Sequence, residues 1–277
     1  MEKAPVSVVI PAYNSRRYIG EAIESVLRQT LPVSEIIVVD NNCTDGTQLI
    51  AKELGAKLVY QQIQGASAAR NRGIEAARGP WIAFLDADDI WDKQKIAEQW
   101  QALEKFPEAR IVLSDFGFLI EPGPKIISPE PGKKPEIDDP ERLIIDGDYS
   151  FCPAYTNDLF EWFLMMTPTT IFHREVFQTV GQFDESFPLA QDLEFFQRAL
   201  ARFPAVTVKK NLAYIRKHED NRSNDQRALM EMQIRVAEKM LESSEDYPPG
   251  SGEFFRERMK RTFLARAEDK GKTGNPQ

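Results

Sequence analysis

The 277-residue chain has little cysteine and no long hydrophobic segment. Its two cysteines, Cys43 and Cys152, are too few for a disulfide framework, and their scarcity fits a reducing compartment. No run of about 18 apolar residues occurs, so no transmembrane helix is expected. The net charge of -8 and the pI of about 5.1 argue against nucleic acid as a partner, because phosphate backbones select basic surfaces.

The first residues also lack a long apolar stretch. Met1-Glu2-Lys3 leads within a few residues into a short β-branched run, so the start does not resemble a secretory signal peptide. These absences predict a cytoplasmic protein. The length suffices for one large α/β domain, or a domain with an appendage, and a core of that size needs no disulfide or metal to stabilise it.

Short apolar runs alternate with helical patterns over the first 120 residues. Strands are expected at residues 6–10, 36–39, 57–60, 81–85, 111–113 and 116–120. Helices are expected at residues 18–27, with Ser15 as the N-cap, and at 47–54, 67–78 and 92–106. Short buried strands that alternate with helices predict an α/β fold, a Rossmann-like and mostly parallel sheet with helices on both faces.

The second half of the chain is less regular. Six prolines between residues 121 and 140 predict a loop or insertion there, and 144–166 fits either one helix face or a segment that covers the substrate. Beyond it, strands are expected at 169–172, 206–208 and 212–215, and helices at 174–180, 189–203, 225–241 and 254–267. We predict a domain over 1–220 and a helical extension over 221–277. The extension's amphipathic helices would pack on the domain, on a partner or on a membrane surface.

The segment Asp86-Ala87-Asp88-Asp89 follows a predicted buried strand directly. Three carboxylates at such a place are costly unless a cation accompanies them, and Mg²⁺ or Mn²⁺ shares oxygen ligands with substrate phosphates. Because alternate residues of an extended segment point to the same side, Asp86 and Asp88 would face one site and Asp89 would face away. The alternative is that these acids cap the following helix.

Other strand ends and helix starts add candidates. In an open parallel sheet, ligands bind outside the carboxyl ends of the strands, where Tyr13-Asn14 and Asp40 lie. Asx residues also open turns, so a structural role for Asn14 and Asp40 stays open. Arg70 lies near the start of a predicted helix, which suits an anion, or it is a surface arginine.

Two later residues complete the set. Asp192 and Glu194 lie in the first turn of a predicted helix and point about 200° apart, so at most one of them would face the site and act as a general base. The helix dipole also favours acids there without any catalytic role. His218 is either a metal or diphosphate contact or a structural residue.

The chain resembles the family 2 glycosyltransferases over about residues 5 to 220, in motifs that occur in the family's order. These motifs are Val8-Val9-Ile10-Pro11-Ala12-Tyr13-Asn14, Ile37-Val38-Val39-Asp40-Asn41, Ala69-Arg70-Asn71, Phe84-Leu85-Asp86-Ala87-Asp88-Asp89, Gly181-Gln182-Phe183-Asp184 and Gln191-Asp192-Leu193-Glu194. The resemblance implies a GT-A fold and a metal-dependent hexosyltransferase that inverts the anomeric carbon. It also implies a nucleotide-sugar donor, with a UDP-sugar expected first.

The resemblance also implies a role for each matching position. Those expected at the nucleotide are Pro11, Ala12, Tyr13, Asn14, Asp40, Arg70, Asp86, Ala87 and Asp88. Asp88 and His218 would hold Mn²⁺ or Mg²⁺, and Asp192 would be the catalytic base. Gln191 departs from the family's usual glutamate, which leaves the base in place and changes the contacts on the acceptor side.

The acceptor itself is expected to be a carbohydrate or a lipid-linked molecule of cell-surface polysaccharide or glycolipid synthesis, with residues 121–166 on its side. A lipid-linked acceptor would bring the protein to the inner membrane surface as a peripheral protein. The alternatives are a sugar nucleotidyltransferase, a haloacid-dehalogenase-type phosphatase, and a non-catalytic protein that binds nucleotide sugars or carbohydrate. The phosphatase would need a threonine where Ile90 stands.

Overall fold

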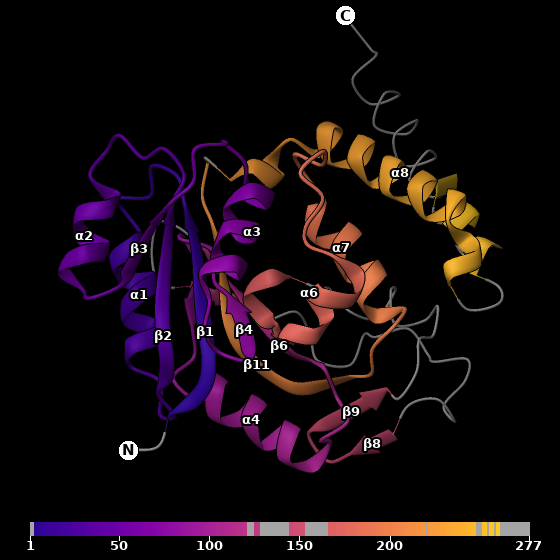
Figure 1. Ribbon diagram of the computed structural model, residues 1–277, viewed down its shortest axis with the longest axis horizontal. Coiled ribbons are helices and arrows are strands. Elements are labelled where there is room, and N and C mark those ends of the chain that lie inside the picture. Colours follow the sequence, from indigo (N-terminus) through magenta and orange to yellow (C-terminus); the bar gives the residue numbers. More distant parts are fainter. Residues whose placement is uncertain are drawn as a thin grey trace, which may run out of the picture.

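The computed structural model describes residues 3–120, 125–127, 144–152, 166–219, 221–247, 251–253, 255–257 and 259–260. It is a mixed sheet between two layers of helices (Figure 1). The strands are β1 Ala4–Ala12, β2 Val33–Asp40, β3 Lys57–Tyr60, β4 Trp81–Phe84, β5 Ile90–Trp91, β6 Ile111–Ile120, β7 Lys125–Ile127, β8 Ile144–Asp146, β9 Tyr149–Cys152, β10 Ile171–His173 and β11 Ala205–Lys217. The α-helices are α1 Ile19–Leu27, α2 Thr47–Glu53, α3 Ala66–Ala76, α4 Lys95–Lys105, α6 Arg174–Val180, α7 Gln191–Leu200 and α8 Gln226–Glu242.

The strand order is β3-β2-β1-β4-β10-β6-β11-β9-β8, with β5 beside β11 and β7 beside β6. β1 to β4 pair in parallel, as the alternation of strand and helix predicts. β10 runs antiparallel between β4 and β6, and β6 then pairs in parallel with β11. The predicted α/β fold class is confirmed, and the sheet becomes mixed where the late strand β10 enters it.

Both faces of the sheet are buried, which explains the continuous apolar runs of the central strands. Val8 and Ile10 of β1 pack in a cluster with α1, α2 and α4. Val9 of the same strand points to the other face, where it packs with residues of α3, α6 and α7. Alternating residues of one strand therefore anchor the helices of both layers.

The structure corrects several expected boundaries. The strands expected at 111–113 and 116–120 are one strand, β6, and those expected at 206–208 and 212–215 are one strand, β11. Polar residues interrupt both apolar runs, and in β11 the pairing shifts register on either side of Asn211. The Ser15 N-cap is wrong. Tyr18 occupies that position, because the Ser15 carbonyl already accepts from the Tyr18 and Ile19 amides in a preceding turn.

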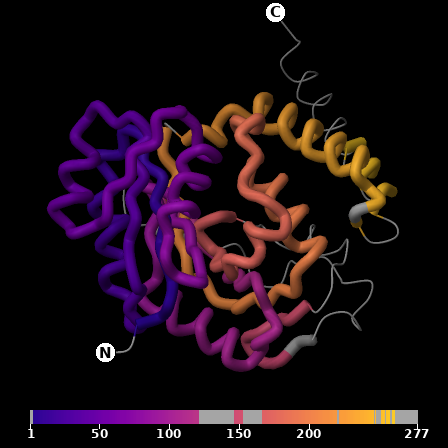
Figure 2. The backbone as a smooth tube through the Cα atoms, viewed as in Figure 1, coloured from indigo at the N-terminus to yellow at the C-terminus, as the bar shows by residue number. Residues whose placement is uncertain are grey.

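The extension begins with α8, which packs on the domain in the residues that the structure describes. Its Val236 and Met240 belong to the same core cluster as Phe195 of α7. Lys239 Nζ donates to Asp184 Oδ2 at 2.7 Å and to Glu194 Oε1 at 2.6 Å. In Figure 2 the tube of α8 runs across the top of the molecule beside the segment that leads into α7. Among the described residues, no helix is both long enough and apolar enough to cross a membrane.

The loop expected at 121–140 lies outside the described residues, apart from β7. Residues 141–143 and 153–165 lie outside them too. The described part of the expected insertion forms β7, β8 and β9, which extend the sheet at β6 and β11. The expected helix at 254–267 lies largely outside them too. The described residues of 251–260 are helical.

Lys95, in the first turn of α4, is a fully buried lysine. Its ammonium group donates to Gln99 Oε1 and lies 4.6 Å from the centre of the Trp91 ring. No described carboxylate forms an ion pair with it. Burial lowers the pKa of Lys95 well below its ordinary value, because an unpaired charge is poorly solvated there.

We expect Lys95→Met to unfold at higher urea concentration than the native chain at pH 8. As the pH falls below about 10.4, unfolded Lys95 takes up a proton that the folded form resists, so native stability drops by up to about 1.4 kcal/mol per pH unit until the lowered pKa is reached. The variant lacks this loss. Urea unfolding at pH 8 and pH 10 measures it, and an equal gain at both values would contradict the assignment.

Candidate active site

The acidic segment after β4 forms a turn that leads into β5, and its three carboxylates have different surroundings. The Asp89 amide donates to the Asp86 carbonyl at 3.1 Å. Asp86 and Asp88 are half-buried, and Asp89 is buried. The expected division, with Asp89 turned away from the other two, therefore agrees with their exposure.

Asp86 is paired with Arg70 of α3. Arg70 Nη2 donates to Asp86 Oδ1 at 2.7 Å and to Thr167 Oγ1 at 3.1 Å, and the guanidinium lies 5.6 Å from the centre of the Phe183 ring. Only 5% of the Arg70 side chain is exposed, so the alternative of a surface arginine is wrong. Its Nε and Nη1 are buried without a hydrogen-bond partner among the described residues. In this structure Arg70 fixes the Asp86 carboxylate.

Asp88 contacts the loop that follows β11. Asp88 Oδ2 lies 3.0 Å from His218 Nε2 and accepts from Asn221 Nδ2 at 3.3 Å. The Asn221 side chain also accepts from the His218 amide at 2.7 Å, which closes the loop into a compact turn. Burial and the nearby charge of Asp86 raise the pKa of Asp88, while the hydrogen bond to His218 opposes that rise. A half-buried carboxylate with a second negative charge close by favours a bound cation.

Arg216 of β11 stabilises the acidic turn through hydrogen bonds to Asp88 and Asp89. The sequence did not predict this role. Its amide donates to Asp89 Oδ1 and its Nε to the Asp88 carbonyl, each at 2.8 Å. The guanidinium also pairs with Glu21 of α1 and lies 4.9 Å from the centre of the Tyr18 ring, which in turn lies 4.9 Å from the His218 ring. Asp89 is thus structural, and one arginine connects it to the loop of His218.

Asp192 lies in the first turn of α7. Ala190, the N-cap residue of this helix, has a positive φ of 55° that redirects the chain into the helix. Burial raises the pKa of Asp192, the Arg70 charge lowers it, and the Asp86 charge raises it, so these three side chains share one electrostatic environment. Glu194 is fully buried elsewhere, bonded to Arg198 and Lys239. The expected separation of the two acids is confirmed.

The ends of β1, β2 and β3 form the other edge of the site. Ala12, Asp40 and Tyr60 follow one another in register across the three strands. Beyond Ala12, Tyr13 is 53% exposed, and Tyr60, which the sequence analysis missed, is 59% exposed. Two exposed aromatic rings at strand ends suit stacking on a planar base.

Asn14 and Asp40 each use an oxygen within the turns at this edge. Asn14 Oδ1 accepts from the Thr44 amide at 2.8 Å, and Asp40 Oδ1 accepts from the Cys43 amide at 2.8 Å. Both side chains therefore stabilise turns, which is the structural role that the sequence left open. Pro11 and Ala12 lie in β1 beside Val39 and Asp40, so their backbone would form the floor of this edge.

The donor set for a metal is incomplete on the protein side. Among the described residues, no three His, Cys, Asp or Glu side chains group in a way that could hold a metal ion. Asp88 and His218 do meet, and a carboxylate oxygen with an imidazole nitrogen suits Mn²⁺ and also Mg²⁺ when phosphate oxygens and water supply the other ligands. The residues present fit a metal that arrives with a phosphorylated substrate.

The structure thus brings together Arg70, Asp86, Asp88, His218 and Asp192 from four segments spread over about 150 residues. The motif order predicts these positions. It does not predict Arg216, Tyr18 or Thr167, because their role depends on strand pairing and helix packing. Asn221 was visible only as part of Asn221-Arg222-Ser223, a chance match to a glycosylation acceptor.

Comparison with solved structures identifies the fold. The structure of Staphylococcus aureus TarS 1-349 superposes with a TM-score of 0.69 at 19% identity, covering 100% of this chain and 76% of that one. The same protein in complex with UDP-GlcNAc gives a TM-score of 0.64 at 21% identity, covering 87% and 67%. The fold is the expected GT-A fold, a central sheet flanked by helices.

Curated relatives agree. TuaG of Bacillus subtilis, named as a teichuronic acid biosynthesis glycosyltransferase, is 43% identical over 124 residues, which are 43% of this chain and 48% of TuaG. The uncharacterized glycosyltransferase alr2836 of Nostoc is 29% identical over 225 residues, covering 78% of this chain and 66% of that one. The chain spans about half the length of TuaG and 30% of a second B. subtilis relative, EpsH. The family model "Glycosyl transferase family 2" matches residues 7–161, more than half of the chain, and the chain therefore belongs to glycosyl transferase family 2.

Proposed function

We propose that this protein is an inverting glycosyltransferase that moves a sugar from a nucleotide-diphosphate donor to a hydroxyl acceptor. The observation that carries the proposal is the contact of Asp88 with His218 beside the charge of Asp86, which also acts on Asp192. Membership of the family supports it. Family membership also argues against the alternatives of a sugar nucleotidyltransferase and a phosphatase.

A UDP-sugar is the donor that we expect. TarS, which shares the fold, has been crystallised with UDP-GlcNAc and with UDP. The exposed rings of Tyr13 and Tyr60 would stack on the base, and Asp40 and Asp86 would accept hydrogen bonds from the nucleoside. The name of TuaG supports an acceptor that belongs to cell-surface polysaccharide synthesis. The protein would meet such an acceptor at the inner face of the membrane.

In the proposed reaction the acceptor oxygen bonds to C1 of the donor sugar while the bond from C1 to the diphosphate oxygen breaks. The nucleoside diphosphate leaves with the bonding electrons, and the Asp192 carboxylate takes the hydroxyl proton. Attack from the side opposite the diphosphate inverts C1. Asp88 and His218 would hold a divalent metal, which would neutralise charge on the diphosphate. Arg70 would hold the Asp86 carboxylate oriented toward the nucleoside.

A thermal-shift panel of UDP-, GDP- and dTDP-sugars, each with Mg²⁺ or Mn²⁺, tests the proposal. A ligand that binds only the folded state raises the melting temperature, and one present at 100 times its Kd adds about 2.7 kcal/mol of stability. We expect the largest shift for a UDP-sugar with Mn²⁺. The Asp88→Asn variant should lose the part of the shift that depends on metal.

The outcomes separate the alternatives. A flat response to every donor would reject the transferase. A donor-dependent shift without donor hydrolysis or transfer would favour a non-catalytic binding protein instead.

A further inference from the structure

Glu194 is a fully buried acid in the first turn of α7, two residues after the proposed base Asp192. Arg198 donates to both of its carboxylate oxygens, from Nε at 2.7 Å and from Nη2 at 2.8 Å. Lys239 of α8 adds a third bond, from Nζ to Oε1 at 2.6 Å. A carboxylate that water does not reach needs such partners, because a buried charge is costly unless it is paired and hydrogen-bonded. Two cations therefore fix the first turn of α7 through Glu194.

The contacts of Glu194 also determine how α7 is rotated about its own axis. Residues two apart in a helix point about 200° apart, so a helix that directs Glu194 toward Lys239 directs Asp192 to nearly the opposite side. Burial raises the pKa of Asp192, and the charges of Arg70 and Asp86 act on it in opposite directions, so these side chains share one environment. A rotation or fraying of the turn would displace the carboxylate of Asp192 from that environment.

Lys239 also contacts the segment that leads into α7, residues 181–190. Its Nζ donates to Asp184 Oδ2 at 2.7 Å. Burial acts to raise the pKa of Asp184, but hydrogen bonds from Lys239 and Ser186 lower it to about 2, so the carboxylate is ionised. A single ammonium group thus connects two carboxylates, one before the start of α7 and one after it.

The helix α3, which carries donor-side contacts, is bonded to the same segment. Asn71 Nδ2 donates to the Phe183 carbonyl, and the Phe183 amide donates to Asn71 Oδ1, each at 2.9 Å. Ser67 Oγ donates to the Asp184 carbonyl at 3.1 Å. The guanidinium of Arg70 lies 5.6 Å from the centre of the Phe183 ring. The segment is therefore fixed to α3 through its backbone and to α8 through Lys239.

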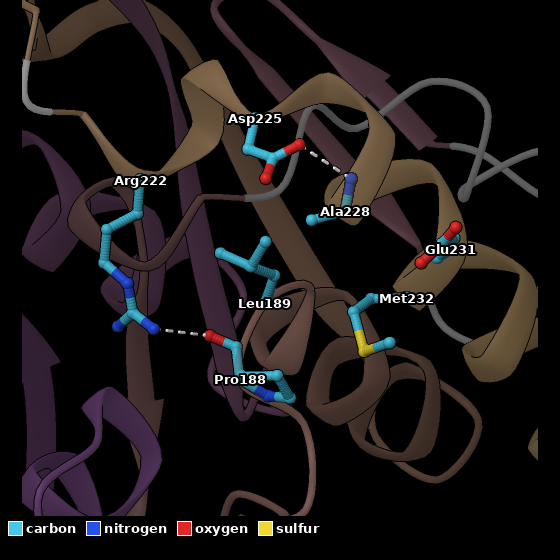
Figure 3. Close-up of a pocket in the computed structure, with 7 residues that line it drawn as sticks. All are labelled: Pro188, Leu189, Arg222, Asp225, Ala228, Glu231 and Met232. Atoms are coloured by element: carbon cyan, nitrogen blue, oxygen red, sulfur yellow. Dashed lines mark hydrogen bonds between the residues drawn. The ribbon is translucent and has the colours of Figure 1, made fainter.

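Two arginines bond α8 and the turn before it to this segment as well. Arg222, just before α8, donates from Nη2 to the Pro188 carbonyl at 2.9 Å, as Figure 3 shows. In α8 itself, Arg235 donates from Nη1 to the Ser186 carbonyl at 3.0 Å. Because α8 cannot move away without releasing these bonds, Lys239 stays within reach of both of its carboxylates.

We propose that Lys239 is a positioning residue for glycosyl transfer, which orients the carboxylate of Asp192 by pairing with Glu194 and Asp184. The inference rests on the proposed function, since it takes Asp192 as the base. Lys239 acts through the first turn of α7 and not by contact with the substrates. The helix α8 then contributes to the reaction, although the match to the family model ends at residue 161.

Hydrolysis of UDP-glucose and UDP-GlcNAc with Mn²⁺ tests the role, because water then takes the place of the unidentified acceptor hydroxyl. Lys239→Met keeps the length of the side chain and removes its charge. We expect kcat to fall about 10- to 100-fold with a nearly unchanged donor KM, since a displacement of about 1 Å in an active site can cost 10²-fold. Lys239→Arg, which keeps the charge and can bond to two carboxylates, should recover most of the rate.

Arg227→Met is the matched control, because it removes another cation of α8 whose side chain is 72% exposed. Exposed ion pairs contribute little, so kcat and the donor KM should equal those of wild type. Should Lys239→Met fail to fold, Asp184→Asn removes one of the two partners of Lys239 and leaves Glu194 paired. It should give a smaller fall in kcat, again without a change in the donor KM.

Hydrogen exchange of the Glu194 amide, which donates to the Ala190 carbonyl at 3.1 Å, gives a readout that needs no turnover. A turn that opens locally exchanges faster than the core around it. The exchange should speed up in Lys239→Met and keep its native rate in Lys239→Arg and Arg227→Met. The amides of β1 should keep their rates in all of these variants, which separates a local movement from a general loss of stability.

Several results would overturn the positioning role. Native kcat in folded Lys239→Met is one, whatever the exchange shows, because Lys239 would then serve stability alone. A raised donor KM with native kcat is another, since it would place Lys239 among the donor contacts. If Lys239→Met does not fold, native kcat in Asp184→Asn rejects the role.

Failure of the proposed function looks different. Wild type would then neither bind nor hydrolyse any UDP-sugar, and the kinetic comparison would reject the transferase itself. The exchange of the Glu194 amide still decides whether Lys239 fixes the first turn of α7: a native rate in Lys239→Met would reject that contact as the one that positions Asp192.

Discussion

Asp192→Asn is expected to lower the rate of glycosyl transfer by about 10²- to 10⁴-fold, the usual contribution of a general base. The asparagine keeps the size of the side chain and can still accept a hydrogen bond from the Leu193 amide, as Asp192 Oδ1 does at 2.8 Å. It cannot take the proton of the acceptor hydroxyl. Donor binding, measured by thermal shift, should be nearly unchanged.

The pH profile gives the same residue a second signature. Burial places the pKa of Asp192 above its ordinary value, and the base works only when ionised. The transfer rate should therefore fall as the pH drops through that raised pKa, and the acidic limb should lie above the value of 3.8 for a free aspartate. In Asp192→Asn the limb should disappear from the residual rate.

Glu108→Gln is a suitable control, because Glu108 is exposed in the turn between α4 and β6, outside the candidate site. Its transfer rate should equal that of wild type. A normal rate in Asp192→Asn would remove Asp192 from the reaction. Weakened donor binding in that variant would instead place it among the donor contacts.

Arg216→Met is expected to lower the free energy of unfolding by about 3 kcal/mol, as when one partner of a buried ionic group is removed. Arg216 is 6% exposed and Asp89 is 3% exposed. The charge of Arg216 opposes the rise in the pKa of Asp89 that burial and the neighbouring aspartates cause. Without the guanidinium, Asp89 and the Asp88 carbonyl stay buried with less compensation. Urea unfolding measures the loss.

The same variant should also weaken binding of Mn²⁺, which titration calorimetry with the metal and UDP measures without turnover. Arg216 positions the turn that carries Asp88, and it contacts Tyr18, which packs on His218. Glu21→Gln is the matched control. The Glu21 side chain is 63% exposed, and an exposed ion pair contributes about 0–1 kcal/mol. Equal effects of the two substitutions would show that Arg216 acts only through the surface pair.

The sequence predicts those residues of the candidate site that belong to local patterns. Strand ends are local features, so a carboxylate that follows an apolar run, such as Asp86, is visible in the sequence. The split of Asp192 and Glu194 follows from helix geometry alone. The roles of Arg216 and Asn221 were not predicted, because each depends on a hydrogen-bond partner about 130 residues away in the sequence. No local pattern encodes such a contact.

The fold shows the same limit. Asn211 and its polar neighbours divide an apolar run that the structure joins into β11, since pairing with β6 continues past the irregularity. β5 is only two residues long, and it exists because β11 offers it a partner. Cross-strand pairing therefore decides what periodicity leaves ambiguous.

The position of β10 has a consequence for dissecting the protein. The match to the family model ends at residue 161, whereas β10 begins at Ile171 and fills the centre of the sheet between β4 and β6. A fragment cut at the end of that stretch would leave two interior strands with open edges, where unpaired amides and carbonyls invite association with other chains. The end of the family-model match is thus not a boundary of independent folding, and a cooperative unit must reach at least through β11.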